Sequence, residues 1–302
     1  MATEIPFLRE FSFQYGRLET LAPGLRRIVA KNPSPFTFRG TGTYVVGAGE
    51  VAVIDPGPDD PSHVEALLAG LGRERVTHIL VTHTHRDHSP AAKALKAATG
   101  APSYGFGPHA GGRRGEAGAE EGGDWDFVPD IPVADGERVR GPGWEFEAVH
   151  TPGHTSNHLC FALAGTGILF SGDHVMGWST SVIVPPDGDM AAYMASLDKL
   201  LGRGDRVYWP THGPAVTDPK AHVRAFVAHR REREAGILDC LRDGIGDIEG
   251  IVERLYVGLQ PGLRRAAGRS VHAHLLDLLG RGVVVADGGP TIEARYRLTG
   301  GG

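Results

Sequence analysis

The densest group of chemically active side chains in this sequence lies between residues 83 and 88. Three histidines and one aspartate fall within six residues, in the order His83, His85, Asp87 and His88. Imidazole nitrogen is a good ligand for zinc and iron, and carboxylate oxygen suits harder cations. A short segment that offers both can hold two adjacent metal ions, so the sequence predicts a binuclear metal site.

Two metal ions need about three donors beyond this group, because each takes roughly four to five ligands. Three later segments have the same character, with a His or an Asp among small residues after an apolar run. They contribute His154 in Pro-Gly-His-Thr, Asp173 in Ser-Gly-Asp-His and His212 in Thr-His-Gly-Pro. Glycine and proline allow sharp turns at strand ends, where α/β proteins place their chemistry.

The elements that must position these residues follow from the apolar pattern. They are strands near residues 43–47, 51–55 and 76–82, and helices over Pro61–Leu71 and Ala91–Ala98. Ser89 is the expected N-cap of the second helix, Pro90 its first residue, and Gly100 ends it. Asp87 and His88 therefore lie just before a helix N-terminus.

These motifs, in this order, resemble the metallo-β-lactamase superfamily over about residues 25–215. Within it the chain is most similar to the lactamase-B-like protein 2 group, on the segment Asn32–Tyr44 and on a C-terminal helical part with a hairpin. Gly42 departs from the Gly-Thr-Asn-Thr-Tyr pattern of that group, which removes any hydrogen bond of the expected Asn. The resemblance implies an α/β fold, the αββα sandwich, followed by a small winged-helix-like α+β domain.

The resemblance also divides the seven candidate ligands between two metal ions. It assigns His83, His85 and His154 to the first ion, Asp87, His88 and His212 to the second, and Asp173 to both as a bridge. Zinc (Zn²⁺) is the expected metal, with Mn²⁺ or Fe²⁺ as alternatives. A hydroxide shared by the two ions would attack an ester-type bond, either a thioester or a phosphodiester of single-stranded RNA. Asp87, which could orient the water, and Asp173 are the candidate catalytic residues.

Other histidines have a structural interpretation. His78, inside a strand, is expected to pack or to support a ligand, and His174 faces solvent or substrate or serves the structure alone. Six are expected as solvated side chains on helix or loop surfaces, namely His63, His109, His222, His229, His272 and His274. Asp55, at the end of an apolar run, either accepts an N–H from a ligand imidazole or starts a turn.

From about residue 222 the pattern becomes helical, which predicts a hydrolase domain over 1–220 and a winged-helix-like domain over 221–302. Its predicted elements are helices over Val223–Arg242, Ile248–Tyr256 and Ser270–Leu279, then a hairpin of 283–285 with 291–298. Residues 221–302 carry 12 arginines and 10 acidic residues, and the resulting charge of +2 is weak for a nucleic-acid surface. We expect this domain to cap the active site, with nucleic-acid binding as the alternative.

Residues 105–123 contain eight glycines in 19 positions, which predicts a solvated loop, with a lid over the site as the alternative. A phosphodiester substrate would favour a basic rim. The candidates for it are Arg86, Arg113, Arg114, Arg264, Arg265 and Arg269. Ordinary surface solvation explains these arginines equally well.

Length and composition set the outer bounds. The 302 residues, 41% of them apolar, suit one large domain and one small one, with no membrane-spanning run and no secretion signal at the start. Cys160 and Cys240 lie far apart and outside the motifs, which favours free thiols in a reducing cytoplasm. The motifs contain no Cys ligand and the start shows no secretion signal, so antibiotic hydrolysis is not expected to be the main role of the chain. The oligomeric state is not encoded in these patterns.

Two other functions remain open from the sequence. One is an oxidoreductase with a single iron, like the persulfide dioxygenases of the same fold, although Asp87, His88 and His212 would then have no role. The other is a non-catalytic nucleic-acid-binding protein that uses the winged part alone, which the complete ligand set argues against.

Overall fold

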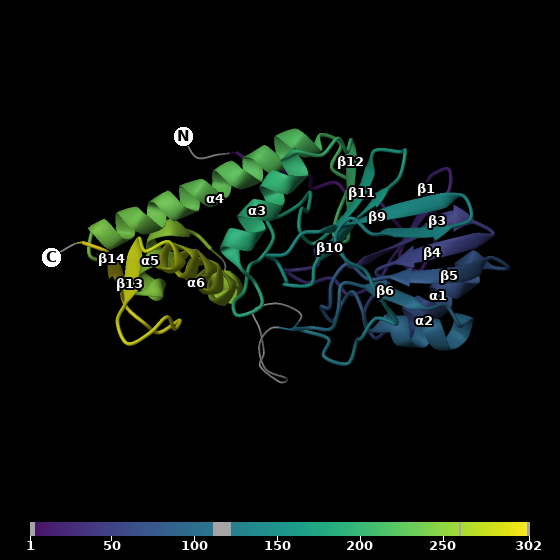
Figure 1. Cartoon of the computed structure of the whole chain (residues 1–302), viewed down its shortest axis with the longest axis horizontal. Coiled ribbons are helices and arrows are strands. Elements are labelled where there is room, and N and C mark those ends of the chain that lie inside the picture. The colour runs from purple at the N-terminus through teal and green to yellow at the C-terminus, as the bar shows by residue number, and fades with distance from the viewer. Residues whose placement is uncertain (1–3, 111–121, 260, 301–302) are drawn as a thin grey trace.

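The computed structural model describes residues 4–110, 122–259 and 261–300. Two sheets pack face to face, and helices cover their outer faces (Figure 1). Most of the glycine-rich segment expected to be a loop or a lid, together with Arg113 and Arg114, lies outside the described residues. The fold class predicted from the sequence is confirmed.

The first sheet contains the strands that precede the first histidine group. Its strands, in spatial order, are β1 (Glu19–Ala22), β2 (Leu25–Val29), β3 (Gly42–Ala48), β4 (Glu50–Ile54), β5 (Arg75–Leu80), β6 (Ser103–Gly105) and β7 (Ile131–Pro132). β1 to β4 are antiparallel neighbours, whereas β4 to β7 run parallel. Parallel strands end at one edge, which brings the loops after β4 and β5 together.

The second sheet carries the remaining predicted ligands at its strand ends. Its spatial order is β12 (Val207–Pro210), β11 (Ile168–Gly172), β10 (Leu159–Leu163), β9 (Trp144–His150) and β8 (Arg138–Gly141). β11 and β12 are parallel, and helix α3 (Met190–Leu201) connects them. The interval between Asp173 and His212 therefore holds one helix and one strand, as its length predicts.

Alternation along the strands explains the layered core. Val51 and Val53 of β4 pack toward helices α1 (Pro61–Leu71) and α2 (Ala91–Thr99), whereas Ala52 and Ile54 face the other sheet. The space between the sheets is filled by large side chains, including Tyr44, Phe146, Phe161 and Phe170. Such a rigid double layer fixes the strand ends that carry the site.

The start of α2 differs from the prediction by one residue. Pro90 occupies the cap position of this helix, and no side chain caps it. Ser89, the predicted cap, instead donates its hydroxyl to Asp124 Oδ2 at 2.6 Å. Ser89 therefore bonds to a carboxylate of a distant segment and does not cap the first turn of α2.

The C-terminal part consists of helices and a short hairpin. It comprises α4 (Pro219–Arg242), α5 (Ile248–Leu255), a 3₁₀ turn (Pro261–Leu263), α6 (Arg264–Gly280), β13 (Val284–Ala286) and β14 (Tyr296–Leu298). Helix α6 begins six residues before its predicted start, because the small buried residues Ala266, Ala267 and Gly268 do not produce an amphipathic pattern. The hairpin is confirmed, but its second strand is shorter than predicted.

Helix α4 belongs to both parts of the molecule, and Figure 1 shows it running from the sandwich to the C-terminal helices. Its first half packs Val223 and Phe226 under the second sheet, and its second half packs Ile237 and Cys240 in the C-terminal core. The predicted division at residue 220 falls at the start of this shared helix and stays a prediction.

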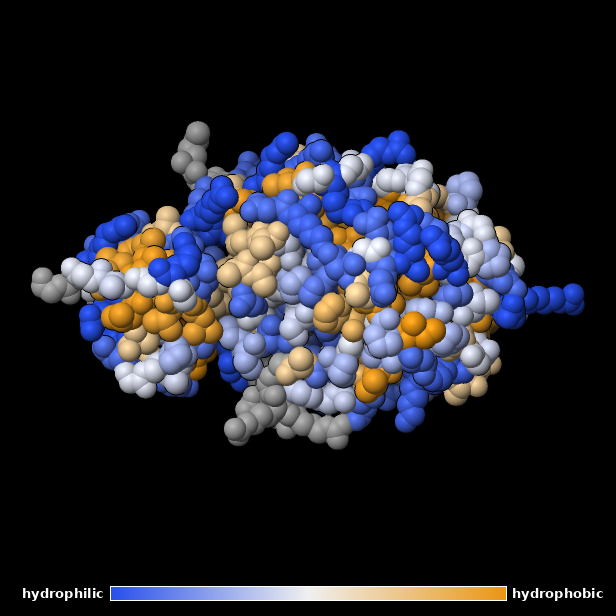
Figure 2. All heavy atoms as spheres, viewed as in Figure 1, coloured by the Kyte–Doolittle hydropathy of each residue, from blue (hydrophilic) through white to orange (hydrophobic). Residues whose placement is uncertain are grey.

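The surface is mostly hydrophilic, but hydrophobic side chains gather over the C-terminal part in the view of Figure 2. Both cysteines are free, as predicted, and both are buried. Among the described residues, no helix is both long and apolar enough to cross a membrane.

Candidate metal centre

The loops at the strand ends bring the seven predicted ligand residues together. The first four follow β5, His154 follows β9, Asp173 follows β11 and His212 follows β12. All seven side chains are buried. They form overlapping groups whose ligand atoms lie within 4.8 Å of one another.

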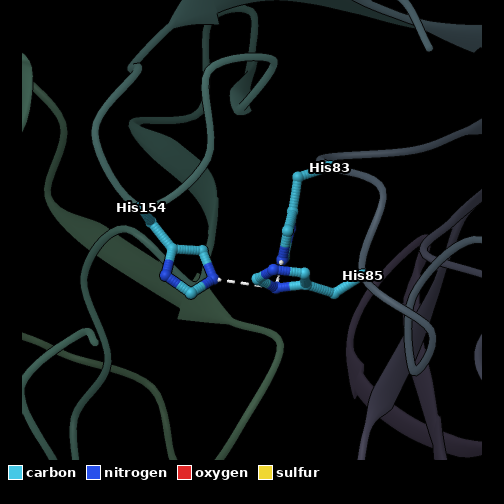
Figure 3. A group of neighbouring side chains, drawn as sticks. All are labelled: His83, His85 and His154. Atoms are coloured by element: carbon cyan, nitrogen blue, oxygen red, sulfur yellow. Dashed lines mark hydrogen bonds between the residues drawn. The ribbon is translucent and has the colours of Figure 1, made fainter. Parts of the chain in front are cut away.

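One half of this centre consists of imidazoles only. His83 Nε2 lies 2.9 Å from His85 Nδ1, and His154 Nε2 lies 3.1 Å from the same atom (Figure 3). Burial, and then the neighbouring imidazoles, hold the pKa of both His83 and His85 well below the usual value. These rings are neutral at pH 7, which is the form that binds metals.

The other half combines imidazoles with carboxylates. Asp87 Oδ2 lies 3.0 Å from His212 Nε2 and 3.3 Å from His88 Nε2. Burial opposes a charge on His212, but Asp173 and Asp87 outweigh it and raise the pKa of His212 to about 10. Burial likewise opposes the charge of Asp87, but His88 and His212 hold its pKa below the usual value.

Asp173 lies between the two halves. Its Oδ2 is 3.3 Å from His212 Nε2, 3.5 Å from His88 Nε2 and 3.9 Å from His154 Nε2. One carboxylate oxygen therefore faces imidazoles from both groups, the geometry that a bridging ligand requires.

The donor set fits divalent cations. Within the described part of the chain, His88 Nε2 and Asp173 Oδ1 are buried without a hydrogen-bond partner. Leaving such atoms unpaired costs about 1–3 kcal/mol each, a penalty that coordination would remove. A tetrahedral zinc ion with Zn–N bonds of about 2.1 Å keeps its ligands about 3.4 Å apart, close to the spacing of the three imidazole nitrogens.

Hydrogen bonds behind the rings turn the Nε2 atoms of four histidines inward. The Nδ1 contacts are His83 with Thr82 Oγ1 at 3.1 Å, His88 with Asp55 Oδ2 at 3.0 Å, His154 with Val182 O at 2.7 Å and His212 with Gly40 O at 3.2 Å. A proton held on Nδ1 leaves the Nε2 lone pair free for a metal. His85 instead presents Nδ1 to the other two imidazoles.

Asp55 takes the first of its two predicted roles. It is buried in the left-handed conformation, with φ of 48°, which is uncommon for a residue other than glycine. Besides facing His88, its carboxylate accepts from Thr82 N, Thr82 Oγ1 and Thr211 Oγ1, each at 2.8 Å. It thereby ties the loops after β4, β5 and β12 together.

The segment that carries the narrower resemblance supports Asp87. Asn32 accepts from Thr41 N at 2.9 Å and donates to Thr41 Oγ1, which in turn donates to Asp87 Oδ2 at 3.2 Å. Gly42, found where Asn was expected, donates its N–H to Thr211 O at 2.8 Å, and a Cβ would lie 3.1 Å from that oxygen. The departure leaves the centre in place.

His158 supports the centre and was missed in the sequence. Its Nε2 accepts the N–H of Asp173 at 3.2 Å, and its Nδ1 lies 2.8 Å from Thr151 Oγ1. The neighbouring Asn157 donates to Thr84 Oγ1 at 2.8 Å. The sequence signal for His158 was its position four residues after His154, at the start of an apolar strand.

The expectation of solvated histidines is wrong for most of the six. His63, His222, His272 and His274 are buried, and the His109 side chain lies largely buried beside His85. They sit on inward-facing positions, and burial lowers the pKa of His63, His222, His272 and His274, which favours the neutral ring. His229 is half-buried.

The other two histidines that the sequence singled out, His174 and His78, serve packing. His174 is completely buried against Tyr193, so it does not face solvent, and burial lowers its pKa to about 3. His78 packs between Tyr104 and Trp144, as predicted.

A narrow pocket opens above the centre. It is lined by His85, Asp87, His154, Asp173, His212, Phe36, Thr37, Met176 and Val182. Its volume of about 20 Å³ has room for one water molecule. The predicted rim residue Arg86 is exposed in a different groove, beside α2.

Comparisons with known proteins agree with this geometry. The family model described as the metallo-β-lactamase superfamily matches residues 37–212, and that of the β-lactamase associated winged helix domain matches residues 248–292. The chain is 30% identical to the β-lactamase-like protein 2 homologue of Drosophila melanogaster, over 85% of this chain and 88% of that protein. It is also 30% identical to the atrochrysone carboxyl ACP thioesterase of Claviceps purpurea, over 79% of this chain and 74% of that protein.

A solved structure extends the likeness to the whole fold. A metallo-β-lactamase family protein from Thermus thermophilus superposes with a TM-score of 0.74 and 25% identity, over 93% of this chain and all of that one. The winged-helix prediction and the resemblance to the lactamase-B-like protein 2 group are therefore confirmed. The chain belongs to the metallo-β-lactamase superfamily and is a metallohydrolase of that fold.

Proposed function

We propose that this chain is a binuclear metal-dependent thioesterase. The observation that carries the proposal is the position of Asp173, whose Oδ2 faces His154 on one side and His88 and His212 on the other. Two separate ligand groups that share one carboxylate suit two ions rather than one.

The seven residues would act in the roles that the resemblance implies. His83, His85 and His154 would hold one ion, Asp87, His88 and His212 the other, and Asp173 both. Bound there, two divalent ions lower the pKa of a water that serves as nucleophile and stabilise the negative charge on the substrate oxygen. Zinc is the expected metal at both positions, and iron or manganese also suit these donors.

The chain's own residues orient this site and exclude bulk water from it. Thr41 donates to Asp87, which fixes the carboxylate so that it can align a water in the pocket. The pocket admits about one water and is walled by Phe36, Met176 and Val182. In such a low-dielectric space the attraction between ions and a developing oxyanion is stronger than in bulk water.

A thioester with an apolar acyl group is the substrate class that these features favour. Phe36, Met176 and Val182 place apolar side chains beside the centre, where the acyl carbons next to the reacting carbonyl would lie, and the relative from Claviceps purpurea is named a thioesterase. Single-stranded RNA, the other predicted substrate, has weaker support, because Arg86 is in another groove and the C-terminal part carries little net charge. The cytoplasmic location stays a prediction.

Metal analysis and thiol release test this proposal together. Protein purified without added metal should contain close to two zinc, manganese or iron ions per chain and should release free thiol from acyl thioesters. His85→Ala should lose activity together with at least one of the two ions. A single iron per chain, with oxygen uptake on a persulfide, would instead identify an oxidoreductase.

A further inference from the structure

Arg230, in the middle of α4, is a buried cation whose contacts lead to the metal centre. It is 4% exposed, and no described carboxylate lies within ion-pair distance of it. Its guanidinium donates to the carbonyl oxygen of Ser181 and, at 3.4 Å, to Ser270 Oγ of α6. Burying a charge without an acid is costly, so these contacts and the ring of Tyr193, 5.2 Å from Cζ, must offset that cost.

The carbonyl that Arg230 binds belongs to a segment that touches the centre from behind. Ser181 Oγ lies 2.5 Å from the main-chain oxygen of Asp173 and 2.8 Å from that of His174. The next residue, Val182, accepts the Nδ1 proton of His154 at 2.7 Å. Two adjacent residues thus contact the main chain of one proposed ligand and the ring of another.

Helix α3 adds a second support to the same place. Tyr193, which lies under the Arg230 guanidinium, donates its hydroxyl to His174 O at 3.0 Å. Gly153, beside His154, packs so closely on Tyr193 that a Cβ would lie 2.3 Å from its Cα. Moving Arg230 would therefore disturb the 181–182 segment and also Tyr193, whose hydroxyl binds the main chain of His174 and whose backbone packs against Gly153.

We propose that Arg230 is a positioning residue for the metal centre, through which the C-terminal helices hold His154 and Asp173 in their metal-binding orientation. The inference rests on the proposed metal centre. Arg230 also contacts Ser270 of α6. One guanidinium therefore connects helices α4 and α6 to the 181–182 segment that contacts His154. The C-terminal part would thus influence metal affinity although none of its described residues lines the pocket.

The test compares Arg230→Met with Arg233→Met in the full chain. Arg233 lies on the same helix, donates to Leu255 O at 2.8 Å and covers Tyr256 with its Cζ 4.6 Å from the ring, but it does not contact the 181–182 segment. Each apoprotein is titrated with Zn²⁺ against a chelator, and its melting temperature is measured separately.

Arg230→Met should weaken one of the two zinc sites about 10- to 100-fold, the range for residues that orient a ligand. The other site shares Asp173 and should weaken less than the first, whereas Arg233→Met should leave both sites unchanged. Arg230→Lys keeps the charge and one donor, so it should fold and fall between Arg230→Met and the wild type. Equal zinc affinities in Arg230→Met and Arg233→Met at both sites would overturn the inference.

A metal-free readout separates this inference from the proposed function. Long-range ¹H–¹⁵N spectra of the apoprotein report which nitrogen of His154 carries the proton. The wild type and Arg233→Met should hold it on Nδ1, whereas Arg230→Met or Arg230→Lys should give a mixture of tautomers. A wild type with fewer than two zinc sites would contradict the binuclear proposal, and an unchanged His154 spectrum in both Arg230 variants would contradict this one.

Discussion

The two halves of the centre are built from different donors and are oriented by different parts of the chain. His83, His85 and His154 form an imidazole half, whereas Asp87 and His88 belong to a half that includes carboxylates. His88 is oriented by the Asp55 carboxylate, but His154 is oriented by the carbonyl of Val182.

The origin of these supports explains why the difference matters. Asp55 joins loops of the two sheets, so its support comes from within the sandwich. Val182 belongs to the segment that Arg230 holds from α4, so its support comes through the C-terminal helices. One half should therefore depend on the sandwich alone, and the other also on the C-terminal part.

The largest effect is expected where the halves meet. Asp173→Ala removes the carboxylate that faces both groups, so both ions should bind weakly and thioesterase activity should fall more than about 10²-fold. Elemental analysis and thiol release measure the two losses. Asp198→Ala, on the exposed face of α3, is the control and should behave as the wild type. Full occupancy of both sites in Asp173→Ala would refute the shared bridge.

Removing one histidine from each half should separate the two ions. His154→Ala and His212→Ala each delete one imidazole and leave the other half intact, so each protein should retain close to one ion per chain. Activity should fall about 10²-fold in both, since a lone ion cannot fill both roles. The comparison would fail if either variant lost both ions or kept both in elemental analysis.

The supports behind the ligands should have smaller and selective effects. Asp55→Asn keeps the size of the side chain but replaces one acceptor oxygen with a donor, so it should weaken the His88 half about 10- to 100-fold. It should leave the His154 tautomer unchanged, the reverse of the pattern expected for Arg230→Met. Zinc titration together with the ring ¹⁵N spectrum distinguishes Asp55→Asn from Arg230→Met. The same zinc affinities and the same spectrum in both variants would contradict the contrast between the halves.

Sequence patterns pointed to the candidate ligands more directly than to the residues that support them, for a physical reason. His83 to His88 are visible because metal-binding residue types cluster at a strand end, and His154, Asp173 and His212 repeat that context. The bond from Thr211 to Asp55 joins residues 156 positions apart, and no local pattern encodes it.

Hydrogen bonds from a ligand to the main chain are even harder to predict from the sequence. The acceptor for His154 is a carbonyl of Val182, and every residue has a carbonyl, so the sequence carries no trace of it. The buried histidines show the same limit, because helical periodicity does not tell a polar residue that packs from one that is solvated. His63 and His274 were misjudged on that account.

The smallest expected effect concerns one buried histidine behind each support. His63 Nε2 lies 2.9 Å from Thr43 Oγ1, which donates to Asp55 O at 2.7 Å, whereas His274 lies on α6 close to Arg230. Burial lowers the pKa of His63 to about 4 and that of His274 to about 3, where Arg230, His229, Arg281 and Arg233 add to the effect of burial.

Both pKa values lie below the value of 6.5 expected for the unfolded chain. The stability that each neutral ring contributes is therefore complete above pH 6.5 and is lost as the pH falls toward the folded pKa. Because of each histidine, the free energy of unfolding should fall by about 2 kcal/mol between pH 7 and pH 5.

Urea unfolding at the two pH values measures this decrease. The decrease should be smaller in His63→Gln and in His274→Leu than in the wild type. If acid weakens the support of each half separately, the two reductions should add, because His63 lies on α1 and His274 on α6. If the double variant loses as much unfolding free energy between pH 7 and pH 5 as the wild type, groups other than these two histidines cause the acid destabilisation.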